Sequence, residues 1–158
     1  MDFTFNEEQS MIRDQVEQFV QKEYDWETRQ ELSNSDLGFG AKNWKTFAEL
    51  GWLGIAISED SGGFGGSAIE TMLIMEEFGK GLIVEPFLET IVMSSGLLDQ
   101  HGTEDQKNDV IGPVISGEMH LALAYAEPQS RFNLSDVVTE AKDVGGNFIV
   151  NGFKSVVM

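Results

Sequence analysis

The sequence has no cysteine and few basic residues, and each absence excludes whole classes of function. Without cysteine, its 158 residues cannot form disulfides, thiolate nucleophiles or cysteine-based zinc or iron–sulfur sites. Ten Lys and Arg stand against 27 Asp and Glu, giving a formal net charge of −17 at pH 7. This balance argues against nucleic acid and anionic membrane surfaces as partners, because both need clustered basic residues.

Long apolar runs and targeting signals are also missing. No run approaches the roughly 18 apolar residues of a membrane-spanning helix, and residues 1–5 carry neither a signal-peptide nor a transit-peptide pattern. We therefore expect a soluble, cytoplasmic protein without a membrane span. Hydrophobic residues still make up 41% of the chain, with 11 Phe and 3 Trp, which is enough for a core.

Charge and hydrophobic period both change near residues 117–120. Residues 1–120 contain 23 acidic and 7 basic residues, a net charge of −16, whereas residues 121–158 contain 4 and 3, a net charge of −1. The apolar spacing is helical before this point and strand-like after it. We place a domain boundary here, with an all-helical domain over residues 1–118 and the first strands of a β-domain over residues 119–158.

Five helices are predicted in the first part. Three carry the capping-box pattern at their N-termini: Asn6–Gln9, Ser67–Glu70 and Thr103–Gln106. Another begins near Pro86, one ends at Gly51, and Pro113 should kink or end the last helix. The apolar residues expected to face the core are Ile12, Val16, Phe19, Val20, Trp44, Phe47, Leu50, Ile69, Met72, Leu73, Phe78, Phe87, Leu88, Ile91, Leu97, Leu98, Val110, Ile111, Val114 and Ile115.

Apolar runs at residues 121–125, 137–139, 148–150 and 155–158 predict a three- or four-stranded antiparallel sheet. Turns are expected at residues 145–147 and at Asn151-Gly152, a strong hairpin signal. The last run stops without a turn, so we expect a fragment of a longer protein. The predicted fold class is mainly α, followed by an incomplete antiparallel β-domain.

Residue patterns alone identify no catalytic site. The glycine-rich segment 62–67 precedes a helix, so it either contacts a phosphate or is a connecting loop that positions the helix cap. His101 and His120 are not at metal-ligand spacing, and we expect no metal site. Common hydrolase, metalloprotease and calcium-loop motifs are absent.

The chain resembles, in order, the N-terminal part of an acyl-CoA dehydrogenase. The segments LGWLGI (50–55) and SEDSGGFG (58–65) are similar to the family's LGLLGI and PEEYGGLG. GTEDQK (102–107), with Pro113 and SGE (116–118), resembles GTEEQK…P..ASGE. AEP (126–128) and NGFK (151–154) resemble the TEP and NG.K signatures of the family's middle β-domain.

This resemblance implies an oxidoreductase of fatty acid metabolism with FAD as cofactor and an acyl-CoA as substrate. In that family the flavin accepts the β-hydride while a carboxylate removes the α-proton, and the protein supplies position and electrostatics. The base normally lies in a C-terminal helical bundle, so no catalytic residue is assigned here and the fragment is expected to be inactive. Implied partners are an electron-transfer flavoprotein or equivalent acceptor, and a homo- or hetero-oligomer with a related subunit.

The resemblance also places binding residues. The expected cofactor contacts are Tyr125, Ala126, Arg131, Phe132, Val156 and Met158. The expected substrate contacts are Glu89, Thr90 and Met93, on the helix that begins near Pro86, although Met93 is equally consistent with core packing.

The loop after residue 125 departs from the family's TEPGAGSD. Ala126 lacks the Thr hydroxyl, and Arg131 and Phe132 occupy the Gly and Ser positions. Arg131 either binds the FAD pyrophosphate through charge-assisted hydrogen bonds or pairs with Glu127 or Asp136 and stiffens the loop. The AEPQSR variant most resembles the pimeloyl-type small subunit of paired bacterial acyl-CoA dehydrogenases. Two alternatives are a non-catalytic structural subunit of a heteromer and a flavin monooxygenase of the same fold.

Overall fold

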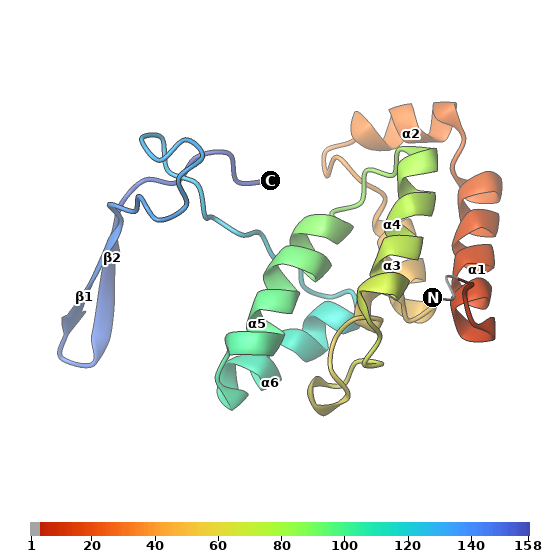
Figure 1. Ribbon diagram of the computed structural model, residues 1–158. Coiled ribbons are helices and arrows are strands. Elements are labelled where there is room, and N and C mark those ends of the chain that lie inside the picture. Colours follow the sequence, from red (N-terminus) through yellow and green to blue (C-terminus); the bar gives the residue numbers. More distant parts are fainter. Residues whose placement is uncertain (1–3) are drawn as a thin grey trace. The chain divides into compact units, whose positions relative to one another are not determined.

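The computed structural model describes residues 4–158, which divide into two compact units (Figure 1). The first unit ends at Leu121 and is helical; the second, Ala122–Met158, contains a small antiparallel sheet. The helices of the first unit are α1 (Glu7–Glu23), α2 (Trp26–Ser33), α3 (Ala41–Glu49), α4 (Ala68–Gly81), the π-helix η3 (Leu88–Ser95), α5 (Gly96–His101) and α6 (Glu104–Ile115), with short 3₁₀ turns η1 (Trp52–Gly54) and η2 (Glu59–Ser61). The strands are β1 (Glu140–Val144) and β2 (Asn147–Asn151).

All three predicted capping boxes form. In the first, the Gln9 amide donates to Asn6 Oδ1 at 2.7 Å and the Asn6 amide donates to Gln9 Oε1 at 3.1 Å. The Ser67 and Thr103 boxes are built in the same way. Because these contacts join residues only three positions apart, α1, α4 and α6 begin where the sequence indicates.

An aromatic cluster forms the centre of the helical unit. α1 packs along α4, and the two helices run side by side in Figure 1. Phe47 of α3 is fully buried, with ring centroids 5.3 Å from Phe19, 5.2 Å from Trp52 and 4.9 Å from Phe78. These edge, tilted and stacked contacts add to the burial of large apolar surface, so the first unit has a core of its own.

Several sequence predictions for the helices are wrong. The sequence pattern does not predict α2, because this helix buries no residue and has no apolar stripe; its one local signal is the Asp25 cap, which accepts from the Thr28 amide at 2.8 Å. The segment after Pro86 is a π-helix that continues into α5 rather than one α-helix. Its wider turns shift the phase of the apolar residues. The predicted core residues Leu50, Ile69, Met72, Leu88 and Leu97 are exposed, because their helices pack through other faces.

Pro113 lies in the last turn of α6, which ends at Ile115. The carbonyl of Pro113 accepts from the amides of Glu118 and Met119 just beyond the helix end. Helix termination near this proline is thus confirmed.

The β unit has two strands among the described residues, not three or four. The predicted strands at residues 121–125, 137–139 and 155–158 do not form, and β1 begins only at Glu140. β1 pairs with β2 in a register that sets Val144 opposite Asn147, so Gly145 and Gly146 form the two-residue turn, both with positive φ. Asn151-Gly152 is not a hairpin turn. A Cβ at residue 152 would collide with the Thr139 side chain, so this glycine allows close chain approach.

Candidate functional site

The loop after Tyr125 is organised by the carboxylate of Glu127. Its Oε2 accepts hydrogen bonds from the Val138 amide at 2.8 Å and from Gln129 Nε2 at 2.8 Å. Its Oε1 accepts from Lys154 Nζ at 2.8 Å and from the Thr139 amide at 3.2 Å. Hydrogen bonds from Lys154, Thr139, Val138 and Gln129 hold the pKa of Glu127 well below its usual range. The residue is therefore a charged centre of this unit at neutral pH.

The two sequence signatures of the β unit lie side by side. The Ser155 amide donates to the Ala126 carbonyl at 2.9 Å, directly beside the Lys154–Glu127 ion pair. The structure thus brings Ala126 together with the segment that contains Val156. The sequence marks Glu127 and Lys154 only as members of the AEP and NGFK motifs. The opposite charges of these two residues, in two motifs of one domain, are the signal that could have predicted their contact.

The Arg131 guanidinium makes no ion pair and no hydrogen bond with any residue that the structure describes. The alternative pair with Glu127 or Asp136 does not form among the described residues. Lys154 occupies the Glu127 carboxylate, and the Asp136 carboxylate forms no ion pair with Arg131. Arg131 has a φ of 49°, in the left-handed region that is uncommon for a side chain of this kind. It is therefore a free cation on an unusual turn.

The remaining predicted cofactor residues are accessible. Phe132 is 100% exposed, and Tyr125, Val156 and Met158 are exposed as well. Val156 has a φ of 52°, an outlier for a β-branched residue. The amides of Tyr125 and Ala126 donate no hydrogen bond to a described residue, so both are free for a ligand.

The predicted substrate residues belong to η3 in the helical unit. Thr90 is fully buried; its hydroxyl donates to the Leu121 carbonyl at 3.0 Å and accepts from the Leu121 amide at 3.3 Å. Glu89 lines a surface hollow of about 350 Å³ whose other walls are Phe87, Leu88, residues 82–85 and the C-terminal half of α4. Met93 is half-buried and lines none of the described hollows of the unit. The three residues therefore face different surroundings.

The glycine-rich segment 62–66 is a connecting loop. The amides of Phe64, Gly65 and Gly66 donate to the carbonyls of residues 54, 57 and 55, and those of Gly62 and Gly63 donate to residues 59 and 58. Every amide of this segment is thus taken by the chain itself, and none is left for a phosphate. The segment serves to position the Ser67 cap of α4.

A buried polar network that the sequence does not reveal joins three parts of the helical unit. Tyr24 Oη donates to Glu85 Oε2 at 3.0 Å and accepts from the Val84 amide at 2.9 Å. Glu85 Oε1 also accepts from the Gly40 amide and from Asn43 Nδ2. Burial, together with the nearby charge of Glu85, raises the pKa of Tyr24. The network ties the end of α1 to the start of α3.

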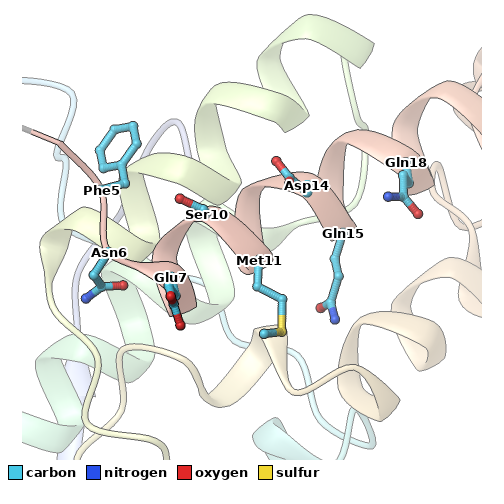
Figure 2. Close-up of a pocket in the computed structure, with 8 residues that line it drawn as sticks. All are labelled: Phe5, Asn6, Glu7, Ser10, Met11, Asp14, Gln15 and Gln18. Carbon is cyan, nitrogen blue, oxygen red and sulfur yellow. The ribbon is translucent and has the colours of Figure 1, made fainter.

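Other surface features bring no predicted site residue together. A hollow of about 440 Å³ lies along α1. Figure 2 shows the side chains that line it, which are mostly polar apart from Phe5 and Met11. No group of three His, Asp or Glu that could hold a metal gathers among residues 4–158. His120 stacks instead on Trp44, with ring centroids 4.7 Å apart, and burial lowers its pKa.

No helix in this part of the chain is long and apolar enough to cross a membrane.

Comparison with known proteins defines the class. Residues 6–118, well over half of the chain, match the acyl-CoA dehydrogenase N-terminal domain family, so the chain belongs to the acyl-CoA dehydrogenase family. The probable acyl-CoA dehydrogenase YngJ of Bacillus subtilis is 30% identical over 98% of this chain, which covers 40% of that protein. The caffeyl-CoA reductase-Etf complex subunit CarC of Acetobacterium woodii is 30% identical over 97% of this chain and 41% of its own length.

A solved structure agrees in fold. An acyl-CoA dehydrogenase from Bacillus anthracis complexed with FAD has a TM-score of 0.86 and 26% identity, over 97% of this chain and 27% of its own. The present chain thus spans about two fifths of the length of the two curated relatives.

Proposed function

We propose that this chain is the N-terminal part of a FAD-dependent acyl-CoA dehydrogenase that introduces an α,β double bond into an acyl-CoA thioester. The observation that carries the proposal is the family match over residues 6–118 together with the ordered β-domain signatures at Ala126–Pro128 and Asn151–Lys154. In this proposal residues 1–118 are the helical domain and residues 119–158 begin the flavin-binding β-domain. The large exposed apolar side chains of the second unit are consistent with strands that a larger domain would cover.

The groups that this chain presents fit FAD. The pyrophosphate is an anion, and Arg131 is a free cation; the unpaired amides of Tyr125 and Ala126 are donors suited to the edge of the isoalloxazine ring. Phe132, Val156 and Met158 supply exposed apolar surface for the same ligand. When bound, FAD supplies the acceptor for the hydride from the β-carbon of the substrate. This chain contributes binding and orientation, and no base is assigned in it.

For the substrate, we propose that the acyl chain lies beside η3. Glu89 is the predicted contact that lines an open hollow, whereas the Thr90 hydroxyl is already held by Leu121. Thr90 and Met93 would then support η3 from the side away from the acyl chain. Met93 would contact the acyl chain only through the exposed part of its half-buried side chain. In this proposal, the shape of the surface beside η3 in the complete protein sets the length of the acyl chain that is accepted.

We also propose that the protein forms a hetero-oligomer with a related subunit, as a pimeloyl-type small subunit does. In this proposal the protein acts in the cytoplasm, and an electron-transfer flavoprotein accepts its electrons. The similarity to CarC, itself a subunit of an Etf complex, supports such partners. The AEPQSR loop supports the narrower assignment.

A second candidate function is a subunit that does not bind flavin by itself. It is favoured by Ala126, which lacks the hydroxyl that the family uses at this position. The two candidates differ in whether the complete protein, purified alone, carries FAD.

Arg131→Ala tests the flavin role. In the complete, properly paired protein we expect FAD affinity to fall at least about tenfold, because loss of one charge-assisted contact of about 1.4 kcal/mol or more is a factor of ten. The affinity is measured by titrating apo-protein and following flavin fluorescence, with Lys142→Ala on β1 as the matched control. Unchanged FAD affinity in the Arg131 variant would show that Arg131 does not bind FAD. A complete wild-type protein that binds no FAD, or that shows no acyl-CoA turnover, would refute the proposed function.

A further inference from the structure

A single ion pair joins the two segments that the proposed flavin site needs. Residues 125–132 and 155–158 hold all the predicted cofactor contacts, and Glu127 and Lys154 lie in or directly beside them. We propose that Glu127 and Lys154 are positioning residues that hold these two segments at a fixed spacing for FAD. The inference rests on the proposed function, because it assumes that both segments contact the flavin.

The geometry makes the pair more than a surface salt bridge. The Glu127 side chain is 0% exposed and that of Lys154 is 25% exposed, with Nζ 2.8 Å from Oε1. A buried carboxylate is stable only when its remaining lone pairs are also satisfied. Here the Val138 and Thr139 amides and Gln129 Nε2 satisfy them. Removing the ammonium would leave a buried negative charge without its cation.

The ion pair and a backbone hydrogen bond form two consecutive links between the segments. Glu127 follows Ala126, and Ser155 follows Lys154, so the 2.9 Å bond from the Ser155 amide to the Ala126 carbonyl lies next to the 2.8 Å ion pair. A change at either charged residue would therefore shift the free amide of Ala126 relative to Val156. A shift of about 0.5 Å or more is sufficient to weaken a preorganised site.

Glu127 also fixes the far end of the loop. Its contacts with the amides of Val138 and Thr139 lead directly into β1, while the Ser130 hydroxyl bridges the amide and carbonyl of Glu127 itself. The turn that carries Arg131 is thus held between Ser130 and the start of β1. One carboxylate positions both the cation proposed for the pyrophosphate and the amide proposed for the isoalloxazine ring.

The experiment uses the complete protein and compares Lys154→Met with Lys154→Arg. Lys154→Met removes the charge while Glu127 keeps its three N–H donors. We expect FAD affinity to fall at least about tenfold and the visible circular dichroism of bound flavin to change. Lys154→Arg restores the cation and should approach wild type in both measurements. Lys142→Met, which breaks the exposed 3.3 Å pair with Glu140, is the control and should change neither.

The outcomes separate this inference from the proposed function. If wild-type protein binds no FAD, the proposed function fails and the inference fails with it. If wild type binds FAD and Lys154→Met binds it equally, with the same dichroism and only a lower Tm, the pair is purely structural and the inference alone fails. A Lys154→Met protein that does not fold, while Lys154→Gln folds and binds FAD as wild type does, overturns the inference in the same way.

Discussion

The two units are stabilised by different kinds of interaction. All the buried apolar side chains of the described chain lie between Val16 and Val114, where Phe47, Trp52 and Phe78 form an aromatic core. In Ala122–Met158 the buried residues are Glu127 and Ser130, both polar, while large apolar side chains such as Phe148 are exposed. A core of this size gives a unit its own cooperative stability, whereas a hydrogen-bonded carboxylate specifies a local arrangement. The first unit therefore has a hydrophobic core of its own, whereas the second leaves its large apolar side chains exposed.

The largest effect is expected from the aromatic core. Phe47→Ala should lower the free energy of unfolding of the 158-residue chain by about 3–5 kcal/mol, because it deletes a fully buried ring and leaves a cavity. Urea unfolding followed by tryptophan fluorescence measures this loss, since all three Trp lie in the helical unit. The matched control Phe148→Ala, at a side chain 70% exposed, should change stability by less than about 0.5 kcal/mol. Equal losses in both variants would contradict the difference between the units.

A smaller effect is expected from the buried network of the helical unit. Tyr24→Phe should destabilise by about 1–3 kcal/mol, because the Val84 amide and one oxygen of Glu85 lose their partner. The same unfolding measurement applies, with Tyr125→Phe as the control at an exposed tyrosine of the second unit. A Tyr24 variant as stable as wild type would show that water replaces the lost contacts.

The smallest effect concerns pH and a helix cap. Burial alone would raise the pKa of Glu70, but hydrogen bonds from Ser67, Gln9 and the backbone lower it to about 2. A depressed pKa adds stability that is complete above the ordinary value near 4.5 and is lost as pH falls toward 2. Glu70→Gln should therefore cost about 1 kcal/mol near neutral pH, after screening by water, and less at acid pH.

Stability curves from pH 7 to pH 2 check this prediction. The control is Glu104→Gln, an exposed residue in the first turn of α6. The wild-type and Glu70→Gln curves should converge toward pH 2. Parallel curves would show that the carboxylate charge of Glu70 adds nothing to the cap.

Local features could be predicted from the sequence. The capping boxes at Asn6, Ser67 and Thr103 contain hydrogen bonds between residues three positions apart, so nearby residues determine where each helix begins. The helical-then-β order was also correct, because hydrophobic period depends on neighbouring residues. Family membership followed from short ordered motifs. These features can be predicted without knowing which residues pack against one another in the folded protein.

Other predictions failed where distant residues decide the outcome. The exposed faces carrying Ile69 and Met72 look apolar in sequence, but the packing of α1 against α4 selects a different face. The strand count was wrong because a strand needs a partner strand for a ladder of hydrogen bonds. Among the residues that the structure describes, residues 155–158 pair with no strand and are joined to residues 121–126 only by the Ser155–Ala126 bond.

The sequence by itself determined the helix starts, the change from helical to β pattern, the acidic charge and the family, because each depends on composition or on residues close together in the chain. The tertiary structure alone decided the Tyr24–Glu85 contact, 61 residues apart, and the Lys154–Glu127 pair, 27 residues apart. It also decided that Arg131 forms no ion pair within the described part of the chain, since Lys154 pairs with Glu127, one of the two carboxylates named as alternative partners of Arg131. Competition among distant groups for one partner is settled only when the folded chain brings them together.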